Sequence, residues 1–173
     1  MIKDIIDVNN LLNNYLSYGL SNTDKLLDYI NDGKVICKFL LINKTIVGFI
    51  KGSIVIDFDK LILNNLGYNE KAIEFLLKNN IESFLSLDLC VIEPSFRGLG
   101  YFEILKNNLF KECNLNYVCG IVWDKNRNLL SSLSLKNTSC LFIDNYWLED
   151  NLYCGYCKSI CYCPAIIFID KLR

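Results

Sequence analysis

The chain of 173 residues contains no histidine. Histidine is the side chain that most often transfers protons in enzymes, and it is a common nitrogen ligand of zinc. Its absence excludes histidine-based catalysis and metal sites with histidine ligands. Any proton transfer must therefore use a carboxylate, Tyr, Cys, Lys, a backbone group or water.

Long apolar runs and blocks of like charge are also missing. No apolar run approaches the roughly 20 residues that a membrane helix needs. The N-terminal segment carries acids early and has no cleavage pattern typical of a signal peptide. The 18 Lys and Arg and 19 Asp and Glu residues are scattered, giving a net charge of −1. We therefore expect a cytoplasmic protein without membrane or nucleic-acid partners.

Hydrophobic residues make up 52% of the chain, which predicts a well-filled core. The length suits one domain, and no repeat or linker of Pro, Gly and Ser interrupts it. We therefore expect a single domain over residues 1–173.

Periodicity along the chain predicts a mixed α/β fold. Helical spacing covers residues 4–18, a short segment ending near residue 30, residues 59–81 with a break at Gly67, a helix from Tyr101, and residues 127–136. Strand patterns cover residues 35–42, 46–56, 85–91, 117–123, 140–147 and 165–169. The strand–helix–strand order over 85–123 predicts that its two strands are parallel, with a right-handed crossover.

The stretch 85–110 predicts an anion site. Its alternating apolar strand ends at Pro94, which cannot donate a ladder hydrogen bond. Gly98 and Gly100 allow a sharp turn with exposed N–H groups, and a helix begins at Tyr101. The first N–H groups of a helix lack internal partners, and the helix dipole is positive there. We therefore expect a phosphate-bearing ligand over residues 97–102.

The same stretch reads Leu87-x-Leu89-x-Val91-x-x-Pro94-x-x-Arg97-Gly98-x-Gly100-x-x-x-x-Leu105. This pattern resembles the acetyl-CoA motif of the GNAT N-acetyltransferase superfamily. Residues 46–52 resemble the second arm of that family's early hairpin, and Val122-x-x-x-Asn126 resembles its later strand-and-helix motif. The resemblance implies a central mixed sheet of about six or seven strands with helices on both faces. It also implies a bulged central strand that splays from its parallel neighbour.

The resemblance implies acetyl-CoA as cosubstrate. Backbone groups of the central strand would pair with the pantetheine arm, and N–H groups of the loop would bind the pyrophosphate. The implied cofactor residues are Leu89, Cys90, Val91, Arg97, Gly98, Leu99, Gly100, Tyr101, Phe102 and Asn126.

The chain departs from the family pattern at two positions. Phe102 stands where the family has a small residue. Its ring either crowds the phosphates or points into the core, and its place in the apolar stripe favours the core. Leu133 stands where many members carry a Tyr that protonates the leaving thiolate, so the general acid is unassigned.

The usual family mechanism is direct attack of an amine on the thioester, with a carboxylate accepting the amine proton. Asp88 is the first candidate, ahead of Asp124 and Glu93; the alternative is a solvated or capped acid facing away from the site. Cys90 has no histidine to activate it and is interpreted as structural. We expect acetyl transfer to a primary amine of a small molecule or protein. The alternatives are a CoA-binding or metal- or redox-sensing module on this fold, or a thiol-rich adaptor.

Four of the nine cysteines gather near the C-terminus, at Cys154, Cys157, Cys161 and Cys163. Four thiolates would make a closed structural zinc site. An iron–sulfur cluster, redox-active disulfides, or buried or surface thiols are the alternatives. Tyr146 and Trp147 precede this loop and are predicted on the acceptor side of the site, with core packing as the alternative.

Overall fold

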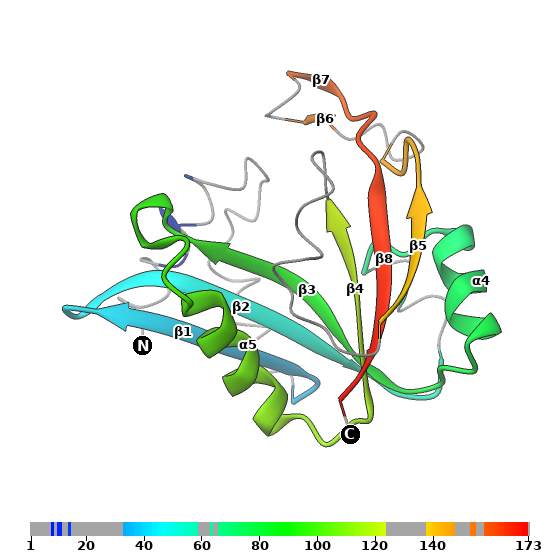
Figure 1. The fold of residues 1–173 in the computed structure, drawn as a ribbon, viewed down its shortest axis with the longest axis horizontal. Helices are drawn as coiled ribbons and strands as arrows, with labels where there is room; N and C mark the ends of the chain where they lie inside the picture. The colour runs from blue at the N-terminus through cyan, green and yellow to red at the C-terminus, as the bar shows by residue number, and fades with distance from the viewer. Residues whose placement is uncertain are drawn as a thin grey trace. The chain divides into compact units, whose positions relative to one another are not determined.

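The computed structural model describes residues 8, 10, 11, 14, 33–58, 63, 66–123, 138–147, 153–154 and 158–172 (Figure 1). The described residues among the first fourteen are helical. The remainder of the predicted helix 4–18, the short helix ending near residue 30 and the helix 127–136 lie outside the described residues. No helix of the described residues has the length and apolar composition to cross a membrane.

The fold is mixed α/β, as predicted, with a six-stranded sheet in the order β1-β2-β3-β4-β8-β5. The strands are β1 Val35–Ile42, β2 Thr45–Val55, β3 Phe84–Ile92, β4 Tyr117–Trp123, β5 Ser139–Ile143 and β8 Ala165–Lys171. Strands β6 Tyr153–Cys154 and β7 Ser159–Ile160 form a separate hairpin. The helices are α4 Glu70–Lys78 and α5 Tyr101–Glu112.

The chain divides into two compact units. The first contains Met1–Ser53 and Asp88–Asn114, and the second contains Ile54–Leu87 and Leu115–Arg173. Strands β2 and β3 each contribute to both units.

The β1–β2 hairpin of the first unit turns at Asn43 and Lys44, between the two predicted strands. Both residues have positive φ, 51° and 64°. Two such residues in a two-residue turn match the twist of the flanking strands. The two strands pair antiparallel, with one register shift beside Leu40.

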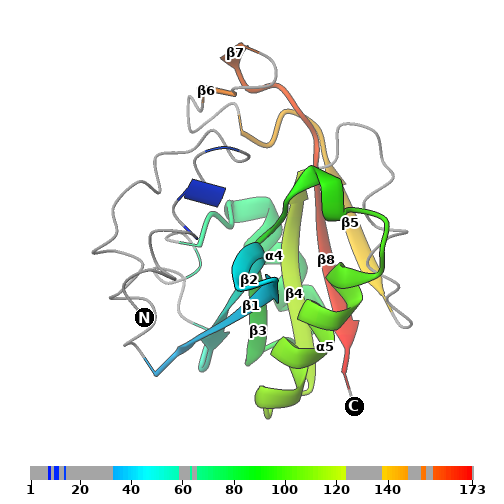
Figure 2. The ribbon, with the colours of Figure 1, turned by 90° about the vertical axis from the view of Figure 1, so that its left-hand side faces the viewer.

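Helical residues pack on both faces of this hairpin. α5 contacts β1 (Figures 1 and 2). A Cβ built on Gly48 would lie 3.3 Å from Cδ1 of Leu105 in α5, so the face of Gly48 is the α5 face. Phe49 points to the other face, where it belongs to an apolar cluster with Val8 and Leu11.

The second unit contains the larger apolar core, to which α4 contributes. Residues 85–87 of β3 pair parallel with β4, as predicted. β4 pairs antiparallel with β8 along its whole length. Gly120 of β4 is required by packing, because a Cβ there would lie 2.6 Å from the Phe168 ring.

One predicted strand was too long. The strand predicted over 140–147 ends at Ile143, and Asn145 of the following turn has φ of 56°. An Asp-Asn pair favours turns, and Asn tolerates left-handed backbone. The predicted break at Gly67 in the helical pattern of residues 59–81 is confirmed, because Gly67 has φ of 86° and α4 begins at Glu70 after it.

Candidate functional site

Strand β3 loses its regular alternation between Asp88 and Ile92. Asp88 contacts Lys51 and Ser53, which lie on one face of β2. Ile92 lies on the opposite face, because its Cγ1 is 3.4 Å from a Cβ built on Gly48. Residues four apart share a face in a regular strand, and β2 pairs regularly with β1 over this stretch. β3 must therefore contain an irregularity of the kind that a bulge makes, as the resemblance implies.

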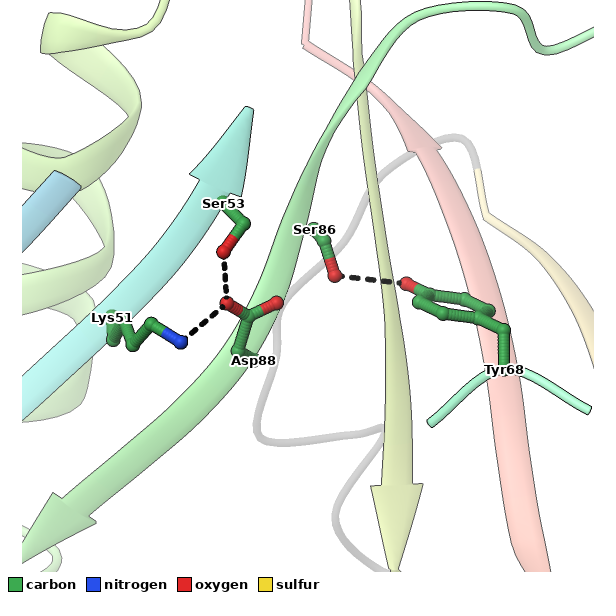
Figure 3. A network of polar contacts seen from close by, with 5 residues as sticks. All are labelled: Lys51, Ser53, Tyr68, Ser86 and Asp88. Atoms are coloured by element: carbon green, nitrogen blue, oxygen red, sulfur yellow. Dashed lines mark hydrogen bonds and ion pairs between the residues drawn. The ribbon is translucent and has the colours of Figure 1, made fainter. Parts of the chain in front are cut away.

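A polar cluster surrounds Asp88. One carboxylate oxygen, Oδ2, accepts the Ser53 hydroxyl at 2.5 Å and the Lys51 ammonium at 3.2 Å (Figure 3). The side chains of Lys51 and Asp88 are only 12% and 10% exposed. Cys37 pairs with Lys51 across the hairpin. We call Cys37, Lys51, Ser53 and Asp88 the Asp88 cluster. Its geometry contradicts a solvated Asp88, and the partners of Oδ2 agree with a capped acid, so the catalytic role of Asp88 stays a prediction.

The second oxygen of this carboxylate, Oδ1, is buried and has no hydrogen-bond partner within the described part of the chain. Buried polar atoms in native proteins nearly always have a partner, and exceptions call for an explanation. Oδ1 of Asp88 is therefore a buried hydrogen-bond acceptor to which no described residue donates.

The two thiols nearest this region are protonated at neutral pH. Burial raises the pKa of Cys90 to about 12. Burial also raises the pKa of Cys37 to about 11, with the Asp88 charge adding to the rise and the Lys51 charge opposing it. Neither thiol is an activated nucleophile, which fits the structural interpretation of Cys90.

Hydrogen bonds within the chain fix the path from β3 to α5. The N–H of Glu93 donates to the carbonyl of Val47 at 2.8 Å, and a 3-10 turn, Pro94–Phe96, follows. The N–H of Arg97 donates to the Pro94 carbonyl at 3.2 Å, and its Nε donates to the Ile92 carbonyl at 2.8 Å. Arg97 thus fastens the loop to the strand end, and its backbone N–H is already engaged.

The loop after Arg97 has left-handed backbone at both of its glycines. Gly98 and Gly100 have φ of 75° and 79°, and a Cβ on either would meet nothing within 4 Å. Gly100 is the N-cap of α5 and provides no side-chain cap. The first-turn N–H groups of this 12-residue helix follow directly, at its positive end.

Phe102 lies along the flank of α5. Its ring centroid is 5.9 Å from the ammonium of Lys106, which is buried and ion-paired with Glu103 at 2.8 Å. Lys106 is one turn further along the helix, so the contact draws the ring toward the helix body. The backbone N–H of Phe102 still belongs to the first turn.

Tyr146 and Trp147 lie in the second unit as packing residues. The Tyr146 hydroxyl donates to the Gly67 carbonyl at 2.6 Å and accepts the Asn69 N–H at 3.1 Å. The two aromatic rings pack edge to face with centroids 4.7 Å apart. This is the core-packing alternative, and an acceptor-side role for either residue stays a prediction.

The predicted zinc ligands are described only in part. Cys161 and Cys163 are buried against Trp147. Cys154 ends the short strand β6, whose side chains are not described, and Cys157, like Asn126, lies outside the described residues. In the described ranges, no three Cys, Asp or Glu side chains gather as metal ligands do. The four-thiol site stays a prediction.

Sequence reasoning missed Lys51 and Ser53. The available signal was their alternate spacing: two polar residues on one face of an otherwise apolar strand. Their partner could not be identified, because it lies on another strand.

No family model matches the chain, and no curated protein matches it by sequence. Solved structures do match. The Escherichia coli ribosomal-protein-S18-alanine N-acetyltransferase is 12% identical, with 98% of this chain and 88% of that chain covered and a TM-score of 0.64. Arabidopsis thaliana NAA60 in complex with acetyl-CoA is 12% identical, with 98% and 94% covered and a TM-score of 0.66.

The chain has the GNAT fold. A GNAT-like decarboxylase, GphF in complex with isobutyryl-CoA, is also similar, at 13% identity, 100% and 97% coverage and a TM-score of 0.60. The GNAT fold therefore accommodates more than one reaction, and at these identities the likeness shows the fold alone. For this chain, function has to be argued from the site itself.

Proposed function

We propose that the chain binds acetyl-CoA and transfers the acetyl group to a primary amine. The observation that carries this proposal is the open start of α5 behind Gly98 and Gly100, directly after the irregular part of β3. Exposed N–H groups at a positive helix end suit a pyrophosphate. Complexes of NAA60 with acetyl-CoA and of GphF with isobutyryl-CoA, on the same fold, support CoA as the ligand.

In this proposal the backbone of Leu89, Cys90 and Val91 pairs with the pantetheine arm. The N–H groups of residues 98–102 bind the pyrophosphate, because that of Arg97 is used within the loop. The N–H of Val91 donates to the thioester oxygen as negative charge develops on it.

The chemistry requires no covalent enzyme intermediate. A neutral amine attacks the thioester carbonyl carbon, the C–N bond forms, and the C–S bond breaks with its electron pair going to sulfur. The amine gives up one proton, for which Asp88 is the proposed acceptor. The CoA thiolate then takes a proton from solvent.

Isothermal titration with CoA and acetyl-CoA tests the binding step, and absence of binding would overturn the proposal. Transfer is measured by mass spectrometry of acetylated agmatine and of a peptide with an N-terminal alanine. These probes follow the amines named for two similar structures. Thiol reagents are unsuitable, because nine protein cysteines compete with CoA. CoA binding without transfer to any amine would favour a binding module instead.

A further inference from the structure

The two carboxylate oxygens of Asp88 differ in their hydrogen-bond partners, and acetyl-CoA binding alone does not require this difference. Two donors converge on Oδ2 of Asp88, the Ser53 hydroxyl and the Lys51 ammonium (Figure 3). Oδ1 is buried without a partner within the described residues. An ionised carboxylate oxygen can accept two hydrogen bonds, and leaving it buried with none is costly. The arrangement points to a donor supplied from outside the chain.

The position of Asp88 places that donor near the proposed acyl group. Asp88 immediately precedes residues 89–91, and three residues of strand span about 10 Å. A nitrogen held by Oδ1 would therefore lie within reach of a thioester bound along this segment.

The charge of the cluster favours a neutral donor. Lys51 already balances the Asp88 carboxylate, so a second cation at Oδ1 would be repelled by the Lys51 ammonium in a poorly solvated site. A neutral N–H donor meets no such repulsion. The attacking form of an amine is neutral and carries N–H groups.

Resting on the proposed function, we infer that Oδ1 of Asp88 receives an N–H of the attacking amine, and that Lys51 and Ser53 are positioning residues. By occupying Oδ2, they fix the rotation of the carboxylate and leave one oxygen aimed at the substrate. As the C–N bond forms and the C–S electron pair moves to sulfur, the N–H proton passes to Oδ1. It leaves to solvent after the product departs.

Two CoA derivatives isolate this hydrogen bond without knowledge of the natural acceptor. S-carboxamidomethyl-CoA carries an amide nitrogen where the attacking nitrogen would lie. S-acetonyl-CoA has the same shape with a methyl group there. The wild-type protein should bind the amide about 10-fold more tightly by isothermal titration, since a hydrogen bond to a charged group is worth at least that much.

Variants identify the residues responsible. Asp88→Ala should abolish the preference, and Ser53→Ala and Lys51→Met should each weaken it at least 3-fold, while Lys51→Arg should restore it. Lys38→Met is the matched control, since Lys38 also lies in the hairpin but pairs with Glu112. CoA affinity and thermal unfolding are measured for every variant.

The outcomes separate the two claims. Absence of CoA binding to the wild-type protein overturns the proposed function. CoA binding with no preference for the amide, or with the same preference in Asp88→Ala or Ser53→Ala, overturns the inference alone. A purely structural role for Lys51 would lower the unfolding temperature without changing the preference.

Discussion

Ser86 and Asp88 are alternate residues of β3, and both place polar atoms out of solvent (Figure 3). Ser86 is 1% exposed, and its hydroxyl shares a hydrogen bond of 3.2 Å with the hydroxyl of Tyr68. Asp88 has partners for one oxygen and none described for the other. The Ser86 hydroxyl has a hydrogen-bond partner inside the core. In our proposal, Oδ1 of Asp88 gains a hydrogen-bond partner only when a substrate binds.

The surroundings of the two residues explain the contrast. Tyr68 belongs to the large apolar cluster, where its ring meets Phe84 edge-on at 6.1 Å. In this apolar surrounding the Tyr68 and Ser86 hydroxyls are partners for each other within the protein. Asp88 instead lies where β3 becomes irregular, and its partners come from one neighbouring strand. Three of the experiments below test this contrast, and the Gly98→Ala experiment tests the proposed CoA-binding loop.

The largest expected effect follows from Asp88→Asn, which keeps the shape of the side chain and removes its charge. Acetyl transfer should fall by about 100- to 10,000-fold, because the amine loses its proton acceptor. CoA affinity should change little. Turnover and CoA binding are measured together, with Ser86→Ala as the neighbouring control, and equal turnover in Asp88→Asn and wild type would contradict the proposed role.

Gly98→Ala should weaken CoA binding about 10-fold or more, because the loop N–H groups lose their geometry. Gly67→Ala is the matched control, since Gly67 also has positive φ and empty space at its Cβ position. Both substitutions should cost about 1–2 kcal/mol of unfolding free energy from backbone strain. Titration calorimetry measures the CoA affinity of each variant, and urea unfolding measures its stability. A similar loss of CoA affinity in both variants would show that the loop does not bind CoA.

Tyr68→Phe should lower the free energy of unfolding by about 1–2 kcal/mol, because it leaves the buried Ser86 hydroxyl without this partner. CoA binding should be unaffected. Adding Ser86→Ala should recover part of the loss, because the stranded hydroxyl is then removed. Urea unfolding of the two single variants and the double variant measures the coupling. Strictly additive losses would show that the pair does not stabilise the core.

The smallest effect concerns Cys37. Its folded-state pKa of about 11 lies above the ordinary 9.0, so stability linked to this thiol is full below pH 9 and is lost as pH rises through 11. Asp88→Asn should lower this pKa and Lys51→Met should raise it, by removing the charges that raise and lower it. Alkylation rates near pH 10, followed by peptide mass spectrometry, should change a few-fold in opposite directions. Unchanged alkylation rates would show that the charges of Asp88 and Lys51 do not affect the pKa of Cys37.

Local chemistry in the sequence was sufficient for much of the fold and of the loop. Pro94, Gly98 and Gly100 each restrict the backbone in a known way, so the strand end and the helix start were predictable. The end of β5 was missed because Tyr146 and Trp147 continue an apolar pattern through an Asp-Asn turn.

The partners of Asp88 were not predictable from local sequence. They depend on how β3 lies against β2, and a shift of one residue would turn each side chain to the other face. The irregularity in β3 adds to this difficulty. It changes the facing of residues beyond Asp88 without a proline or glycine to mark it.

The packing of Trp147 gives the protein an optical reporter of its C-terminal loop. The chain has two tryptophans; the indole of Trp147 lies against Cys161 and Cys163, whereas Trp123 is 37% exposed. Thiols quench indole emission on contact, and burial shifts emission to shorter wavelength. The intrinsic fluorescence of Trp147 should therefore brighten when the two cysteines bind a metal or are alkylated, with Trp123 as an internal reference at longer wavelength.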